Sequence, residues 1–165
     1  MDPRPNDTSA LAGDFADCIA VLNAHGVEFI LVGGFAVGWH GVVRATGDID
    51  FLYEQTPKNV KRLCNALEEF GAPAHLIDAD FLLSRNAVTQ IGNEPFRIDL
   101  LSSISGVSFE KVRAGAVETS IAGQRMLIIG LEELRVNKRA TGRVKDREDL
   151  RRLTPASKVT RKRRR

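Results

Sequence analysis

Cysteine and histidine are scarce in this 165-residue sequence. Two cysteines are too few for a disulfide framework, and three scattered histidines lack the close spacing of a zinc site, so both are excluded. The sequence has no uncharged apolar run of about 18 residues, which excludes a helical membrane span, and it has no Gly-Lys-Ser/Thr phosphate loop. A polar N-terminus without an apolar signal core predicts a cytoplasmic protein.

Positive charge is concentrated at the C-terminal end. Residues 158–165 hold six Lys/Arg and no acidic residue. Without those six, 18 basic residues stand against 21 acidic ones, so the remainder has a net charge of −3 although the whole has +3. We predict a single domain over residues 1–157 and a disordered basic tail over residues 158–165. Such a tail either attaches weakly to a polyanion such as RNA or is only a solvated terminus.

Hydrophobic periodicity predicts a mixed β-sheet with helices packed on it, an α/β (α+β) fold. The expected strands are 27–32, 48–53, 87–91, 96–101, 117–121 and 126–129. The expected helices are 14–25, 35–40, 57–70, 78–86, 131–139 and 144–153. The helix at 57–70 has the clearest signals, with Thr56 as N-cap, Pro57 at its first position and Gly71 as its stop. Cys18 and Cys64 lie on apolar helix stripes, which predicts buried structural thiols.

Three aspartates interrupt the apolar strands. Asp48 and Asp50 are separated by one residue, and because side chains alternate along a strand, both carboxylates share one face. Asp99 lies in a similarly apolar strand. If these strands are neighbours, three carboxylates converge, and such a group needs a shared proton or a cation. An all-oxygen donor set of this kind suits Mg²⁺.

Gly33 and Gly34 end a buried strand and open a helix. Glycine lets backbone N–H groups approach a phosphate, and the start of a helix adds donors. The pair can equally be a tight turn with no ligand. A dinucleotide-binding loop is disfavoured, because Phe35 stands where that loop needs its second glycine, and because it leaves the aspartates unexplained. The aspartates can also cap turns or pair with Arg44 and Arg97.

Residues 31–41, Leu-Val-Gly-Gly-Phe-Ala-Val-Gly-Trp-His-Gly, followed by Arg-Ala-Thr-Gly-Asp-Ile-Asp at 44–50, resemble the DNA polymerase β-like nucleotidyltransferase superfamily. Within it the sequence is most similar to small prokaryotic members related to the AbiEii toxin and to the minimal nucleotidyltransferases. Their pattern is Gly-Gly or Gly-Ser, a gap, Asp-x-Asp and a third acid on a later strand. Residues 142–150 also resemble the Lys-Asp-x-x-Asp-Leu helix of many relatives.

The resemblance implies a nucleotidyltransferase-like fold and transfer of a nucleoside monophosphate from an NTP to an acceptor hydroxyl, with Mg²⁺ or Mn²⁺. The acceptor is left open between RNA such as tRNA, a protein and a small molecule. By position, Asp48, Asp50 and Asp99 would bind the metal and carry the catalysis, with Asp99 as general base. The residues that would contact the nucleotide are Gly33, Gly34, Arg44, Thr46 and Lys145.

The resemblance also implies a partner. Relatives of this size act in toxin–antitoxin pairs, so the chain would be the enzyme of such a pair or a non-catalytic antitoxin or RNA-binding partner of the same fold. The basic tail favours tRNA slightly as the acceptor. An interaction protein with a basic tail is a further interpretation, and magnesium-dependent NTP binding would exclude it.

Overall fold

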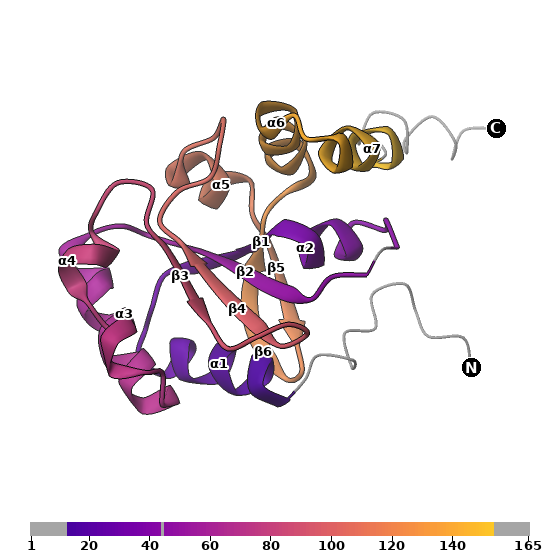
Figure 1. Ribbon diagram of the computed structural model, residues 1–165. Coiled ribbons are helices and arrows are strands. Elements are labelled where there is room, and N and C mark those ends of the chain that lie inside the picture. Colours follow the sequence, from indigo (N-terminus) through magenta and orange to yellow (C-terminus); the bar gives the residue numbers. More distant parts are fainter. Residues whose placement is uncertain (1–12, 44, 154–165) are drawn as a thin grey trace.

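A six-stranded mixed sheet forms the centre of the protein (Figure 1). The computed structural model describes residues 13–43 and 45–153. The strands are β1 Phe29–Val32, β2 Asp48–Tyr53, β3 Val88–Ile91, β4 Arg97–Leu101, β5 Val117–Ile121 and β6 Gln124–Ile128. The helices are α1 Gly13–Ala24, α2 Gly33–Trp39, α3 Pro57–Phe70, the 3-10 helix η1 Ala74–Leu76, α4 Ala79–Leu82, α5 Phe109–Gly115, α6 Leu131–Thr141 and α7 Val144–Arg152. The predicted mixed α/β fold is confirmed.

The strand order β3-β4-β2-β1-β6-β5 places β1 and β2 in the middle of the sheet. β1 pairs antiparallel with β2 and parallel with β6, and β2 pairs parallel with β4. The outer strands β3 and β5 each pair antiparallel with their neighbour. All four residues of β1 are buried, which fits the central place predicted from its apolar sequence.

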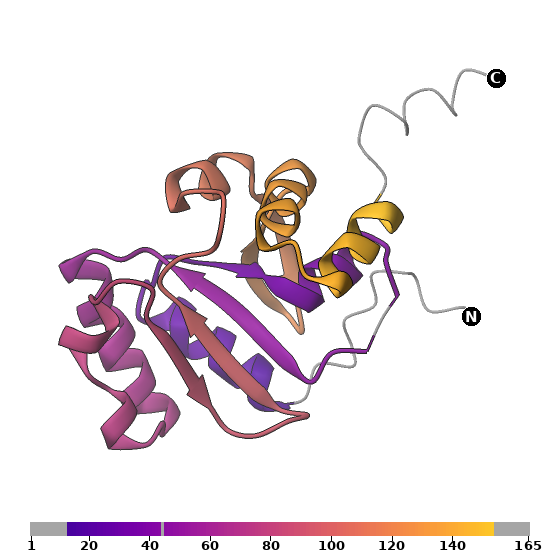
Figure 2. The ribbon, with the colours of Figure 1, turned by 45° about the horizontal axis from the view of Figure 1, so that its top comes forward.

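Helices α1 and α3 lie together on one side of the sheet, and α5, α6 and α7 lie toward the other (Figures 1 and 2). The core beneath the sheet is built from the apolar stripes of α1 and α3, because side chains three or four residues apart share a helix face. The predicted ends of α3 are confirmed. The Thr56 hydroxyl accepts a hydrogen bond from the Asn59 N–H, and Gly71 closes the helix with a φ of 89°.

Two short helices were not expected from the sequence, η1 and α5. α5 has only 7 residues, and its apolar face consists of buried Val112 and half-buried Phe109, which is too short a pattern to detect. Ser108 caps it by accepting from the Lys111 N–H. α4 is shorter than expected and is capped by Asp78, as its sequence predicts. Cys18 is buried, and burial raises the pKa of its thiol to about 12, whereas Cys64 is only half-buried.

The longest helix of the described residues, α3, has 14 residues, and no helix among residues 13–43 and 45–153 is long and apolar enough to cross a membrane. The predicted basic tail at 158–165 lies outside the described residues, as does Arg44.

Candidate active site

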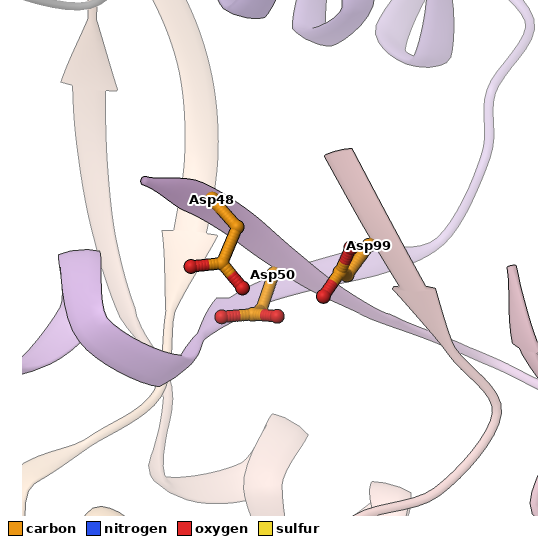
Figure 3. A group of neighbouring side chains, drawn as sticks. All are labelled: Asp48, Asp50 and Asp99. Atoms are coloured by element: carbon orange, nitrogen blue, oxygen red, sulfur yellow. The ribbon is translucent and has the colours of Figure 1, made fainter. Parts of the chain in front are cut away.

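Strands β2 and β4 bring three aspartates together. The two strands are parallel neighbours, and their register sets Asp50 beside Asp99 and Asp48 beside Arg97. Figure 3 shows the carboxylates of Asp48 and Asp50 on one strand turned toward that of Asp99 on the next. One oxygen of each lies within 4.8 Å of the others. The convergence predicted from the sequence is therefore confirmed, and we call these three residues the acidic cluster.

A single guanidinium bridges the acidic cluster. Arg97 donates from Nε to Asp99 Oδ1 at 2.9 Å and from Nη2 to Asp99 Oδ2 at 3.2 Å. The same Nη2 donates to Asp48 Oδ2 at 3.1 Å. The pairing with Arg97 that the sequence left open as an alternative is thus present, whereas Arg44 lies outside the described residues. Among the described residues, one guanidinium pairs with the acidic cluster of three carboxylates.

The negative charges of the acidic cluster are only partly offset by Arg97, and this contributes to a raised pKa of Asp50. Burial, followed by the negative charges of Asp48 and Asp99, raises the pKa of Asp50 to about 7, and Arg97 offsets this only in part. Burial also raises the pKa of Asp99, whose side chain is 8% exposed. Three oxygen donors that repel one another fit a divalent cation such as Mg²⁺ or Mn²⁺, which would supply the missing charge.

Gly33 packs directly against the acidic cluster. Its φ is +71°, and a Cβ at this position would overlap the Asp50 carboxylate, so both the backbone angle and the space require glycine. Gly34 is buried in α2. The Thr46 hydroxyl donates to the carbonyl oxygen of Asp48 at 3.1 Å and to its Oδ1 at 3.2 Å. Thr46 therefore orients Asp48, and its predicted contact with a phosphate stays a prediction.

A pocket of about 390 Å³ opens beside Asp50 and Gly33. Its far side is formed by α6 and the start of α7, through Asn137, Lys138, Thr141 and Arg143. Its remaining lining comes from the β1 end, from the β3 and β4 strands and from the segment after β4. The pocket is therefore lined by two basic side chains and by Asp50, the one member of the acidic cluster in its lining.

The basic side chains of the pocket are held by ion pairs to two buried aspartates. Lys138 Nζ lies 3.1 Å from Asp146 Oδ1 and 3.2 Å from Asp149 Oδ2, and Arg143 Nε lies 2.8 Å from Asp146 Oδ2. Burial alone would raise the pKa of Asp146, but hydrogen bonds from Arg143, Thr141 and Lys138 hold it below its usual range. We call Lys138, Arg143, Asp146 and Asp149 the α6–α7 ion cluster.

The basic side chains that line the pocket are not the lysine that the sequence resemblance had suggested. Lys145 is exposed on α7 and does not line the pocket, so its role at a phosphate stays a prediction. Lys138 and Arg143, which the sequence did not single out, do line it. The signal was there: two acids three residues apart on α7 share one helix face and need a cation, and Lys138 is the nearby lysine on α6.

The fold has solved relatives. It is similar to the crystal structure of TM1012 from Thermotoga maritima, named as a nucleotidyltransferase, with 14% identity, a TM-score of 0.57, and 84% of this chain and 88% of that chain covered. It is also similar to the lincomycin-bound lincosamide antibiotic adenylyltransferase LnuA, with 14% identity, a TM-score of 0.55, and coverage of 85% and 94%. The antibiotic-resistance factor ANT(2'')-Ia has 16% identity, a TM-score of 0.56, and coverage of 88% and 82%.

At such low identity these likenesses concern the fold alone. A comparison with curated proteins finds no match. A family model matches residues 12–164, which is nearly the whole chain. The chain belongs to the family that this model describes, nucleotidyl transferases of unknown function (DUF2204).

Proposed function

We propose that this protein transfers a nucleoside monophosphate from an NTP to an acceptor hydroxyl and releases pyrophosphate. The observation that carries the proposal is the acidic cluster, whose three carboxylates meet within 4.8 Å at a pocket that also presents Lys138 and Arg143. Carboxylates suit a divalent cation, and cationic side chains suit the phosphates that such a cation accompanies. The family assignment and the fold of the solved relatives support the same reaction class.

Asp48, Asp50 and Asp99 would hold the divalent ion, Mg²⁺ or Mn²⁺. A bound ion would offset the negative charge of the phosphates in the transition state. Gly33 leaves room for the Asp50 carboxylate and for a phosphate at the mouth of the pocket. Arg143 and Lys138 would attract the triphosphate from the other side. The proposal also includes the nucleotide contacts that the sequence resemblance implies, those of Gly34, Arg44, Thr46 and Lys145.

In the reaction the acceptor hydroxyl oxygen attacks the α-phosphorus of the NTP. A new oxygen–phosphorus bond forms, the bond from the α-phosphorus to the bridging oxygen breaks, and the electron pair leaves with pyrophosphate. The hydroxyl proton passes to the carboxylate of Asp99. The chain's contribution is to position the two reactants and to hold charged groups where charge develops, which supplies most of the acceleration in such transfers.

A transfer assay tests the proposal. The protein is incubated with each α-labelled NTP, Mg²⁺ or Mn²⁺, and a whole cell extract, beside an Asp48→Ala/Asp50→Ala double variant. We expect label to move from the NTP to an acceptor only with the intact acids and only with the metal. No transfer, together with no metal-dependent NTP binding by calorimetry, would contradict the proposal.

The finer relationship to AbiEii-like proteins belongs to the same proposal. As the enzyme of a toxin–antitoxin pair, the chain would modify a cellular target, and RNA would meet the basic tail. The second candidate is a non-catalytic antitoxin or RNA-binding partner with the same fold. The raised pKa of Asp50 disfavours it, because an unused cluster of carboxylates, half-buried or buried, is a cost in stability.

A further inference from the structure

The lining of the active-site pocket has two chemically different sides. The side from α6 and α7 carries its two cations, Lys138 and Arg143. Among the described residues, the part of the lining that comes from the segments around β3 and β4 has no charged side chain. It consists of one amide, two hydroxyls and three aliphatic groups, from Asn86, Val88, Leu101, Ser103, Ile104 and Ser105. We call these six residues the neutral wall.

The neutral wall begins at the proposed general base. Asp99 lies on β4, with Asp50 of β2 on one side and Gln90 of β3 on the other. Two residues farther along β4, on the same face, is Leu101, and its partner across the ladder is Val88. A molecule lying on Val88 and Leu101 would thus reach Asp99 from the side away from the pocket's cations.

The polar groups of the neutral wall are held in place. Ser103 Oγ donates to Asn86 Oδ1 at 2.8 Å, so the Asn86 amide nitrogen can donate to a ligand. Asn137 of α6 donates from its amide nitrogen to the carbonyl oxygen of Ser105 at 3.0 Å, which joins the neutral wall to the cationic side. Val88 is 48% exposed, an apolar side chain open to the pocket on an edge strand. The wall is therefore built for hydrogen bonds and apolar contact.

This chemistry selects among the acceptors that the proposed function leaves open. RNA would bring a phosphate at every nucleotide to the neutral wall, whose six residues offer no positive charge to offset it. A pocket of about 390 Å³ matches the range of small-ligand sites, and a protein could enter it only with a side chain. An uncharged small molecule with hydroxyls and an apolar part fits each group present.

We infer that the neutral wall binds the acceptor, and that the acceptor is a small, uncharged, hydroxyl-bearing molecule. The inference rests on the proposed nucleotidyl transfer. The cationic side then takes the triphosphate, and the acceptor hydroxyl lies between the two sides, next to Asp99. The covalent step is the one given above, with the hydroxyl proton passing to Asp99 and pyrophosphate leaving.

Extract fractions and Val88 variants test this inference. An extract is split by filtration into a fraction below about 3 kDa and a retained fraction with the RNA and protein, and each is offered with α-labelled NTP and Mg²⁺. Val88→Trp fills the wall, and Val88→Lys adds a cation, which an edge strand tolerates. Val117→Trp is the matched control, because Val117 is an exposed valine on β5, the opposite edge of the sheet.

We expect label in the small-molecule fraction. Both Val88 variants should lower this transfer by about tenfold or more, while metal-dependent NTP binding and the V117W transfer stay at the unsubstituted level. Label in the retained RNA or protein, or transfer to RNA that rises in V88K, would overturn the inference and leave the proposed function standing. Unchanged transfer in both Val88 variants would also overturn it. If the unsubstituted protein shows no metal-dependent NTP binding, the proposed function itself is contradicted.

Discussion

The acidic cluster and the α6–α7 ion cluster both gather buried or half-buried aspartates around basic side chains, but their charges balance differently. In the α6–α7 ion cluster, two aspartates meet Lys138 and Arg143, and the pKa of Asp146 is held below its usual range. In the acidic cluster of three aspartates, Arg97 is the basic side chain that forms ion pairs, counted over residues 13–43 and 45–153, and the pKa of Asp50 rises to about 7. The charges of the first cluster balance, whereas those of the second, counted over the same residues, do not.

The difference separates a group whose charges balance within the protein from one that calls for a bound cation. A buried, balanced ion network ties two helices together and fixes their orientation. In a cluster whose charges do not balance, like charges repel one another, and a bound ligand of opposite charge reduces this repulsion. Both clusters contribute residues to the lining of the same pocket. The ion pairs of the α6–α7 ion cluster hold its part of that lining in place.

Breaking the balanced cluster should have the largest effect on stability. Lys138→Met leaves Asp146 and Asp149 buried without their lysine, because Lys138 is only 5% exposed. We expect the free energy of unfolding to fall by about 3–5 kcal/mol, measured by denaturant titration. Lys145→Met is the matched control on the exposed surface of α7 and should change it by less than about 0.5 kcal/mol. Equal effects of the two substitutions would contradict a structural role for Lys138.

Filling the space beside the acidic cluster should have the next largest effect. Gly33→Ala adds a Cβ that overlaps the Asp50 carboxylate at a φ of +71°. We expect it to destabilise the fold by about 2 kcal/mol and to weaken metal binding. Gly38→Ala, in the same helix but with open space around the added Cβ, should be neutral or stabilising. Thermal melts of the two variants decide this, and a G33A protein as stable as G38A would show that the close approach is unimportant.

Removing one charge from the acidic cluster should stabilise the metal-free protein. The Asp50 carboxyl titrates near 4 in the unfolded chain and near 7 in the folded one, so it costs stability as pH rises from about 4 to 7, and the full cost remains above 7. We expect Asp50→Asn, in EDTA at pH 8, to raise the free energy of unfolding by about 1 kcal/mol or more. At pH 4 the gain should vanish. A variant less stable than the unsubstituted protein at pH 8 would contradict the charge imbalance.

Replacing Arg97 should have the smallest effect of these substitutions, and it tests directly whether the acidic cluster has excess negative charge. Its guanidinium supplies the one positive charge that a metal ion would otherwise supply to Asp48 and Asp99. Arg97→Gln should therefore tighten Mn²⁺ binding by about three- to tenfold at pH 8, measured by calorimetry. Arg113→Gln is a suitable control, because Arg113 pairs with Glu28. Weaker binding in R97Q would mean that Arg97 serves mainly to hold the carboxylates in place.

Much of the fold could be predicted because its signals are local. The alternation around Ile49 and the caps of α3 depend on neighbours in sequence, and the structure has them as expected. The meeting of Asp99 with Asp48 and Asp50 was foreseen only as a condition, because it depends on which strands are neighbours.

The cationic side of the pocket could not be found in this way. The spacing of Asp146 and Asp149 on α7 indicates a nearby cation, but the place of Lys138 and Arg143 in the pocket depends on how α6 and α7 pack, which that spacing does not determine. Lys145, in contrast, matched a family pattern but lies exposed, because the aspartates of that pattern turn inward to Lys138. Helix α5 was missed because it buries only Val112.

The most direct test of the central claim is calorimetric titration of Mg²⁺ or Mn²⁺ at pH 8, with and without ATP, into the unsubstituted protein and the Asp50→Asn variant. The account predicts saturable binding that ATP strengthens, and binding at least about tenfold weaker in D50N. It also predicts weaker binding below pH 7, where Asp50 is protonated. Equal affinity in the two proteins, or no binding to the unsubstituted protein in the presence of ATP, would contradict the assignment of the acidic cluster as a metal site.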